Sequence, residues 1–196
     1  MKKGLWIVLA IVAVIIFWGI GINNRMITSE EGISRAWSQV ENVYQRRMDL
    51  IPNLVNTVEG AANYEKGTLK EVIDARSRAS SVQVTADQLT EESIAKFQSV
   101  QDDLGNALKH SITLTVERYP ELTATQNFRD LQTQLEGTEN RISVERGNFN
   151  KAVQSYNTLI RRFPNSIIAA ICGHEKKGYF TAETGAENAP EVEFGF

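Results

Sequence analysis

The order of apolar and polar positions divides the chain into an apolar N-terminal run and a longer body with helical periodicity. The run extends without a charge from Leu5 to Ile22. As a helix it measures roughly 27 Å, close to the ~30 Å hydrocarbon core of a bilayer. Because Trp6 and Trp18 stand near its ends, where indole rings prefer the interface, we expect a membrane anchor with its flanks over residues 1–27.

A cleavable signal sequence is the alternative interpretation of this run. The apolar part of a signal is shorter, about 7–15 residues, and ends at a small-residue cleavage site. Here Ile22 leads directly into Asn23 and Asn24, so we favour an anchor that is kept. Lys2 and Lys3 before the run favour a cytoplasmic N-terminus and an exported domain. We therefore expect a single-pass protein of the cytoplasmic (inner) membrane with its domain on the periplasmic side.

The body begins at Thr28 and Glu31, which have the spacing of a capping box. This spacing predicts a helix start at Thr28. Apolar positions then recur with three–four spacing in a heptad pattern, which predicts a long packed helix. This seam consists of Ile33, Trp37, Val40, Tyr44, Arg47, Ile51, Leu54, Val58 and Ala61. Pro52 lies inside it, where the missing N–H group predicts a kink. Residues 60–67 loosen the pattern and are expected to end the helix.

Three further helices are predicted after this one. A short helix carries Leu69, Val72 and Ala79 on one side, and a polar stretch over 80–87 reads as a loop. A third helix opens at Thr90 and stops at Pro120, because the residue before a proline disfavours the helical region. The last helix has apolar residues seven apart and ends at Pro164. These residues are Phe128, Leu135, Ile142, Phe149, Tyr156 and Phe163.

Since strand-type alternation is missing from the sequence before its last few residues, we predict an all-α fold. It consists of an N-terminal transmembrane helix followed by an elongated antiparallel bundle whose long helices carry coiled-coil-like heptads. The predicted division is an anchor over 1–27, a bundle over 28–164, and a short apolar segment with a C-terminal tail over 165–196.

Composition and charge exclude several classes of function. A net charge of -3 is a poor match for nucleic acid. A single cysteine, Cys172, rules out an intrachain disulfide and a cysteine-based zinc cluster. The two histidines, His110 and His174, are far apart and outside any ligand-spaced motif. We expect no catalytic residue, no metal and no cofactor.

Charged residues on the apolar seams are the candidate site. Arg47 takes a seam position on the first helix and Glu145 on the last, with Glu139 nearby. Such residues form either a recognition site or a partly buried ion pair that fixes the helix register. We favour an ion pair of Arg47 with Glu139 or Glu145. Asn53, Asn140 and Asn157 are likewise expected to satisfy backbone or side-chain partners at helix contacts.

The C-terminal part supplies candidate assembly contacts. An antiparallel bundle returns Ile167, Ile168 and Ile171 to the bilayer, where they either cap the base of the bundle or contact lipid headgroups or a neighbouring subunit. Further on, Val192, Phe194 and Phe196 alternate with Glu193 and Gly195, as in an added strand or a docked extended segment. We expect a homo-oligomer held at the anchor, the 167–172 run and the tail.

Several stretches of the chain resemble the LemA family of bacterial and archaeal membrane proteins. They include Ala36-Trp37-Ser38-Gln39-Val40, Gln45-Arg46-Arg47-Met48-Asp49-Leu50-Ile51-Pro52-Asn53-Leu54, Tyr119-Pro120-Glu121-Leu122, Glu136-Gly137-Thr138-Glu139-Asn140-Arg141-Ile142 and Arg162-Phe163-Pro164-Asn165. His174-Glu175 departs from the family's usual Gly-Phe. The resemblance implies a membrane-anchored helical domain without established catalytic residues, whose genes often neighbour those of membrane proteases or stress proteins.

Two classes of function are consistent with these features. The first is a membrane-anchored helical scaffold or interaction protein that assembles with itself and contacts membrane lipid through Leu5 to Ile22. Its partners would be copies of itself and membrane or envelope proteins. The alternative is an envelope ligand or stress sensor, or a regulator of a membrane protease. A concave pocket with convergent polar groups favours the sensor, and a large exposed apolar surface favours the scaffold.

Overall fold

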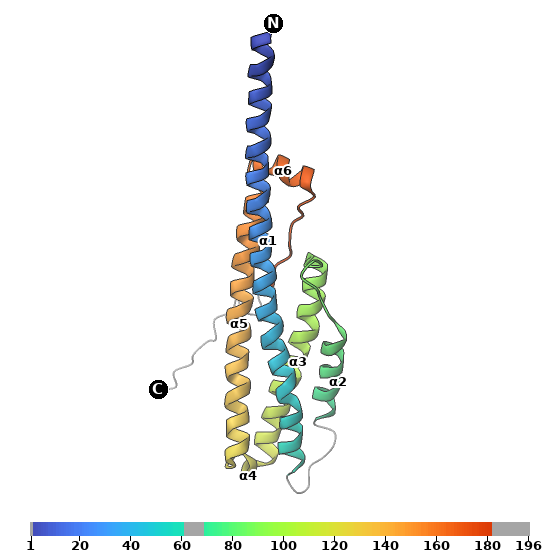
Figure 1. Ribbon diagram of the computed structural model, residues 1–196. Helices are drawn as coiled ribbons and strands as arrows, with labels where there is room; N and C mark the ends of the chain where they lie inside the picture. Colours follow the sequence, from blue (N-terminus) through green and yellow to red (C-terminus); the bar gives the residue numbers. More distant parts are fainter. Residues whose placement is uncertain (1, 61–68, 182–196) are drawn as a thin grey trace, which may run out of the picture.

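A computed structural model describes residues 2–60 and 69–181 of the chain. All regular secondary structure in these two ranges is helical, as predicted. The elements are α1 (Lys2–Glu59), α2 (Lys70–Ser81), α3 (Glu91–Arg118), α4 (Pro120–Thr123), α5 (Gln126–Arg161) and α6 (Asn165–Cys172). Figure 1 shows the upper part of α1 projecting alone above an elongated bundle.

The helix α1 runs unbroken from the apolar N-terminal run into the bundle, so the predicted helix start at Thr28 is wrong. The Thr28 hydroxyl donates to the carbonyl of Asn24 at 2.8 Å, one turn back in the same helix. No proline separates the run from the body, and hence the helix has no reason to stop there. By length and composition, this helix could cross a membrane. Pro52 lies inside α1, and the kink there stays a prediction.

The other predicted helices are confirmed. The start of α3 is a capping box in which the Ser93 N–H donates to Thr90 Oγ1 at 3.1 Å and the Thr90 N–H donates to Ser93 Oγ at 3.0 Å. The C-terminal apolar run forms α6, which ends at Gly173 in the left-handed conformation, φ 77°. That conformation is favourable for glycine, because glycine has no Cβ to clash with the backbone.

Two helix pairs make up the bundle. In Figure 1, α5 runs back up along α1, and α3 lies beside α2. The upper core is built around Trp37, whose ring makes edge contacts with Phe97 and Phe149 at 5.1 and 5.5 Å between centroids. The lower core contains Ile51, Leu54, Leu104, Phe128 and Leu131. Burial of each large side chain stabilises the fold by about 1.5–3 kcal/mol.

After α6 the chain descends alongside the bundle as an irregular segment over residues 174–181, which we call the strap (Figure 1). The strap is held against α3 and α5. Gly178 donates its N–H to the Leu89 carbonyl at 2.9 Å, just before α3 begins. A Cβ on Gly178 would lie 2.7 Å from the Thr90 carbonyl oxygen, so only glycine allows this approach.

Candidate interaction site between α3 and α5

Arg47 links three helices from inside the bundle. Its residue is 2% exposed. Its Nη1 donates to Glu139 Oε1 of α5 at 3.0 Å, and its Nη2 donates to the Gln101 carbonyl and side-chain oxygens of α3 at 2.7 and 2.6 Å. The Arg47 Nε is buried and has no hydrogen-bond partner in the described structure. These contacts use three of the five guanidinium N–H groups, and the Nε group is one of the two that they leave.

Arg146 provides a second crossing from α5 to α3. Its Nη2 lies 2.5 Å from Asp102 Oδ1, and its Nε donates to the Tyr44 hydroxyl at 2.5 Å. Burial raises the pKa of Tyr44 to about 12, although Arg146 and Arg47 favour the phenolate. The sequence prediction missed Arg146. Its position seven residues after Glu139 was the available signal, because residues seven apart on a helix share a face.

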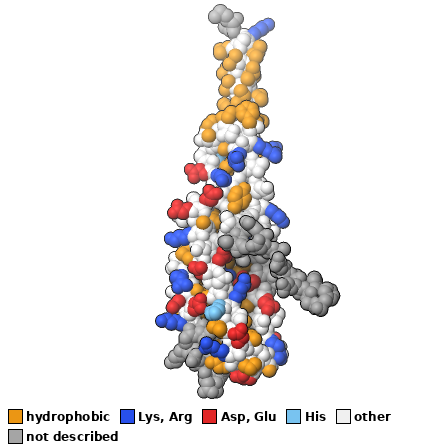
Figure 2. Space-filling model, turned by 180° about the vertical axis from the view of Figure 1, so that it is seen from behind, with side chains coloured by type: hydrophobic (Ala, Val, Ile, Leu, Met, Phe, Trp, Pro, Cys, Tyr) orange, Lys and Arg blue, Asp and Glu red, His pale blue; other side chains and the backbone are white. Residues whose placement is uncertain are grey.

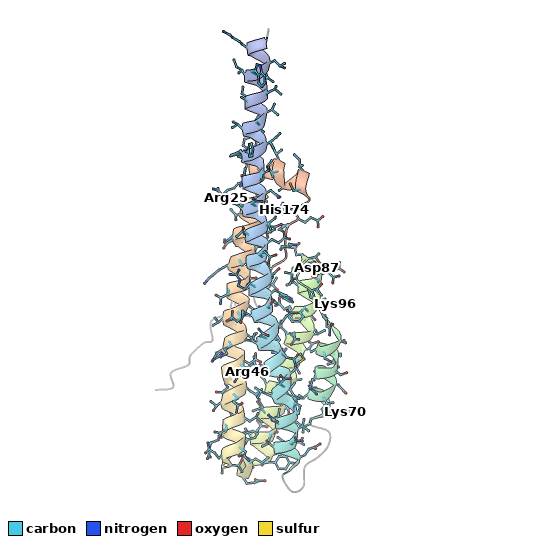
Figure 3. All side chains as sticks on the ribbon, in the orientation of Figure 1. Arg25, Arg46, Lys70, Asp87, Lys96 and His174 are labelled. Atoms are coloured by element: carbon cyan, nitrogen blue, oxygen red, sulfur yellow. The ribbon has the colours of Figure 1, made fainter. Side chains whose placement is uncertain are left out.

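The structure brings Arg47 together with Glu139 and not with Glu145. Glu145 Oε2 accepts a hydrogen bond from the Asn148 side chain on its own helix at 3.0 Å. In Figure 3 the neighbouring Arg46 is labelled beside α5, and its side chain is exposed. Adjacent residues on a helix point about 100° apart, which explains why only one of the two arginines enters the bundle.

Three carboxamide side chains hold the strap by pairing with its backbone. In each pair the side-chain oxygen accepts a hydrogen bond from the N–H of one strap residue, and the side-chain NH₂ donates to the carbonyl of that same residue. The pairs are Asn157 with Lys177, Asn150 with Phe180, and Gln98 with Thr181. All six distances lie between 2.9 and 3.0 Å. Of the three asparagines predicted to satisfy such partners, Asn157 does so through the strap, whereas Asn53 and Asn140 are exposed. The pattern is independent of the strap's side chains.

The side chain of Phe180 anchors the strap in the aromatic core of the bundle. Its ring stacks on Trp37 at 6.1 Å and makes an edge contact with Phe149 at 5.4 Å. The Arg146 guanidinium lies 5.1 Å from the ring centroid and closes the lower end of this seat. Such ring contacts each add about 0.5–1.5 kcal/mol beyond burial.

The space between α3 and α5 continues below the strap as two adjoining cavities. The first has a volume of about 210 Å³ and is lined by Arg47, Asp102, Gly105, Asn106, Lys109, Glu139, Ile142 and Arg146. The second has a volume of about 440 Å³. Gly105, Lys109 and Glu139 line both, and Leu108, Ile112 and Leu135 add apolar surface to the second. We call the two cavities together the open groove.

His174, at the start of the strap, contacts α1 through both ring nitrogens. His174 Nε2 lies 2.9 Å from Asn23 Oδ1, and its Nδ1 lies 3.6 Å from a Glu30 carboxylate oxygen. Lys177 Nζ contacts the other oxygen of Glu30 at 2.7 Å. His110 is exposed on α3. Across residues 2–60 and 69–181 no group of three or more histidine, cysteine or acidic side chains could hold a metal ion.

The predicted assembly residues fall in two places. Ile167 and Ile171 are exposed on α6, whereas Ile168 packs against the upper core. Val192, Phe194 and Phe196 lie outside the described residues. Between α3 and α5 the structure thus holds the strap through its backbone, and the open groove below it is lined by the buried Arg47 and the exposed Lys109.

Comparison with known proteins finds relatives named LemA and MamQ. Protein LemA of Metamycoplasma hominis is 24% identical over 171 residues, which cover 86% of this chain and 74% of that protein. Magnetosome protein MamQ of Magnetospirillum gryphiswaldense is 26% identical over 174 residues, or 80% of this chain. Magnetosome protein MamQ 1 of Paramagnetospirillum magneticum is also 26% identical over 174 residues. The aligned part spans 64% of the length of each MamQ protein.

The family comparison covers nearly the whole bundle. The pattern of the LemA family matches residues 36–194, a range that starts next to Trp37 and includes the arginine crossings, the strap and the groove. The match leaves out only the upper part of α1 and the last two residues. This chain therefore belongs to the LemA family.

Proposed function

We propose that this LemA-family chain is a non-catalytic scaffold, anchored in the membrane by α1, that assembles with copies of itself on the exported side. In this proposal, the apolar end of the C-terminal tail of one copy, with Val192, Phe194 and Phe196, binds in the open groove of another. The observation that carries the proposal is the strap, an extended segment already seated between the same two helices directly above the groove.

The strap supports the proposal because it defines how this surface holds a peptide. Carboxamides on α3 and α5 pair with the peptide backbone, and an aromatic seat takes one ring. Below the strap α5 offers Gln132, whose amide donates to Glu136 Oε1 at 3.1 Å, and Asn140 on the lining of the second cavity. Backbone pairing gives affinity for an extended chain, and pockets for alternate side chains give selectivity.

The sequence of residues 182–196 suits the groove. It contains Glu183, Glu187, Glu191 and Glu193 and no lysine or arginine. In the groove, Glu139 and Asp102 already pair with the two arginines, which leaves the exposed Lys109 as the donor for a carboxylate. The apolar part around Leu108, Ile112 and Leu135 matches the alternating Val192, Phe194 and Phe196.

Length favours a second copy over the same chain. From Gln98, at the end of the strap, to Thr113, at the end of the groove, α3 rises about 22 Å. About seven extended residues cover that distance. A tail that stayed extended in its own groove would place residues 182–188 there and carry Phe194 past the groove. The apolar end of the tail can therefore reach a neighbour.

A cross-linking experiment between two differently tagged chains tests the contact. Both chains carry Cys172→Ser. One also carries Thr113→Cys, and the other carries Phe194→Cys. We expect a disulfide between the two tags, with a yield about threefold lower when Lys109→Glu is added, the size of one exposed ion pair. Lys96→Glu, an exposed lysine that lines neither cavity, is the matched control and should leave the yield unchanged.

The position control is His110→Cys, which replaces Thr113→Cys on the same helix. His110 is exposed and lines neither cavity of the groove. If the His110 and Thr113 variants cross-link equally to Phe194→Cys, or if the Thr113 variant cross-links only when both cysteines are in one chain, the proposed contact is wrong.

A ligand sensor is the second candidate, favoured by the second cavity. That cavity combines an apolar wall with the Lys109 ammonium, which fits a small amphiphile with a carboxylate head. Decanoate should then raise the melting temperature of the full chain, and Lys109→Glu should abolish the shift. An unchanged melting temperature would remove this candidate and leave the scaffold.

A further inference from the structure

The short helix α6 lies against the part of α1 that is long and apolar enough to span the membrane. A Cβ placed on Gly19 would lie 3.3 Å from Ile168 Cδ1. Gly19 belongs to the apolar run, and Ala169 of α6 is buried in the same core cluster as Ile22 at the end of that run. Because α6 packs on the last turn of the apolar run, α6 lies at the level where α1 would leave the membrane.

The other face of this region is apolar and uncovered. Phe163 is 83% exposed, Ile171 is 76% exposed and Ile167 is 52% exposed. In Figure 2, hydrophobic side chains cover the upper part of the molecule down to the shoulder of the bundle, and the acidic side chains begin below it. The exposed face of α6 is thus continuous with the surface that the membrane must cover.

Basic side chains mark the boundary of this apolar region. Arg161 and Arg162 precede Phe163, and both are exposed. Arg25 is an exposed residue of α1, one turn after Ile22. Figure 3 labels it close to His174. Arginines at the edge of an apolar surface suit the phosphate groups of lipids, since their stems stay in contact with apolar surface while their charges reach the headgroups.

We propose that α6 is a second membrane contact, a foot that lies in the interface of the bilayer beside α1. Phe163, Ile167 and Ile171 contact the boundary between headgroups and acyl chains, and Arg25, Arg161 and Arg162 contact lipid phosphates. The foot fixes how far α1 enters the bilayer and how the bundle stands on the membrane. This contact is separate from the open groove and holds whether or not the chain assembles.

Spin labels on the full chain test the foot directly. Cys172 is exposed at the end of α6 and is the only cysteine of the sequence, so Cys172→Ser gives a background for single cysteines at positions 163, 167 and 171. The chain is reconstituted in vesicles of phosphatidylethanolamine and phosphatidylglycerol. We expect the ratio of collisions with oxygen to collisions with a water-soluble nickel chelate to be several-fold higher at these positions than at Gln134→Cys, an exposed site on α5.

Two outcomes would overturn the proposal. Ratios at positions 163, 167 and 171 that equal the ratio at Gln134 would place the foot in water. Low access to both reagents, with spin–spin broadening that disappears on dilution with unlabelled chain, would assign the face to a second copy. Circular dichroism of each variant confirms folding, and the high exposure of the three side chains makes their substitution tolerable.

Discussion

The guanidinium of Arg47 on α1 and the carboxylate of Glu139 on α5 lie 3.0 Å apart, across the two longest helices of the chain. Arg47 is almost fully enclosed, whereas the Glu139 side chain is 37% exposed. The two partners are therefore unequal. Loss of Glu139 leaves a charge in the interior, and loss of Arg47 leaves a carboxylate that can reach water.

Replacing Arg47 with alanine is expected to destabilise the bundle by about 3 kcal/mol, because it removes the link among α1, α3 and α5 and leaves a cavity. Urea unfolding followed by circular dichroism measures the change. Arg46→Ala, an exposed neighbour, should stay within about 0.5 kcal/mol of the parent. Equal effects of the two substitutions would show that Arg47 contributes no more than a surface arginine.

Replacing Arg47 with methionine and Glu139 with leucine together should cost less than Arg47→Ala alone, because no charge is then left without its partner and most of the volume is kept. The same unfolding experiment compares the variants. A double variant less stable than Arg47→Ala would contradict this expectation and would show that the ion pair itself stabilises the helix contact.

Asn150→Ala should release the lower part of the strap. The substitution removes both hydrogen bonds to the Phe180 backbone, at 2.9 Å each, and costs about 1–3 kcal/mol of local stability. Hydrogen exchange at the Phe180 amide should speed up accordingly. Asn148→Ala, an exposed asparagine on the same helix, is the control and should leave that exchange rate unchanged.

Gly178→Ala tests the close approach of the strap to α3. The new Cβ would lie 2.7 Å from the Thr90 carbonyl oxygen and 2.8 Å from the Glu91 nitrogen, so the strap must move away. Gly137→Ala on α5 meets nothing within 4 Å and should instead stabilise the helix by up to about 1 kcal/mol. Protease cleavage in the strap should increase in the first variant only. Unchanged cleavage at Gly178→Ala would mean that the strap is not held there.

The predicted orientation places the bundle outside the cytoplasm, on the strength of Lys2 and Lys3 before the apolar run. In a Cys172→Ser background, Gln134→Cys is an exposed thiol near the start of α5, and α6 follows the other end of that helix. A membrane-impermeant maleimide should label it in intact cells whose outer membrane has been permeabilised. Labelling that appears only after lysis of the inner membrane would reverse the orientation.

How far the sequence predicted this structure depends on the kind of signal each element carries. Helices with repeated apolar seams, such as the one through Phe128, Leu135 and Ile142, were located to within a few residues, because periodic burial is a local property. The start at Thr28 was misplaced, since a capping-box spacing also occurs inside helices. The continuity of α1 across Thr28 follows because no proline separates the apolar run from the body.

The site was harder to predict than the helices. Arg47 stood out because a charge on an apolar seam is unusual, and Glu139 and Glu145 were equal candidates until the helix register was known. The strap was missed because its order comes from Gln98, Asn150 and Asn157, which are distant in sequence. Asn150 and Asn157 are seven residues apart on one helix face, and that spacing was the only local signal.

The mass of the chain in mild detergent tests the central proposal, self-assembly through residues 182–196, most directly. The full chain is compared with a variant that ends at Thr181, over a range of concentrations. The proposal predicts a dimer or larger assembly of the full chain at concentrations where the shortened variant is a monomer, with the same helical circular dichroism for both. Equal masses of the two proteins at every concentration would contradict it.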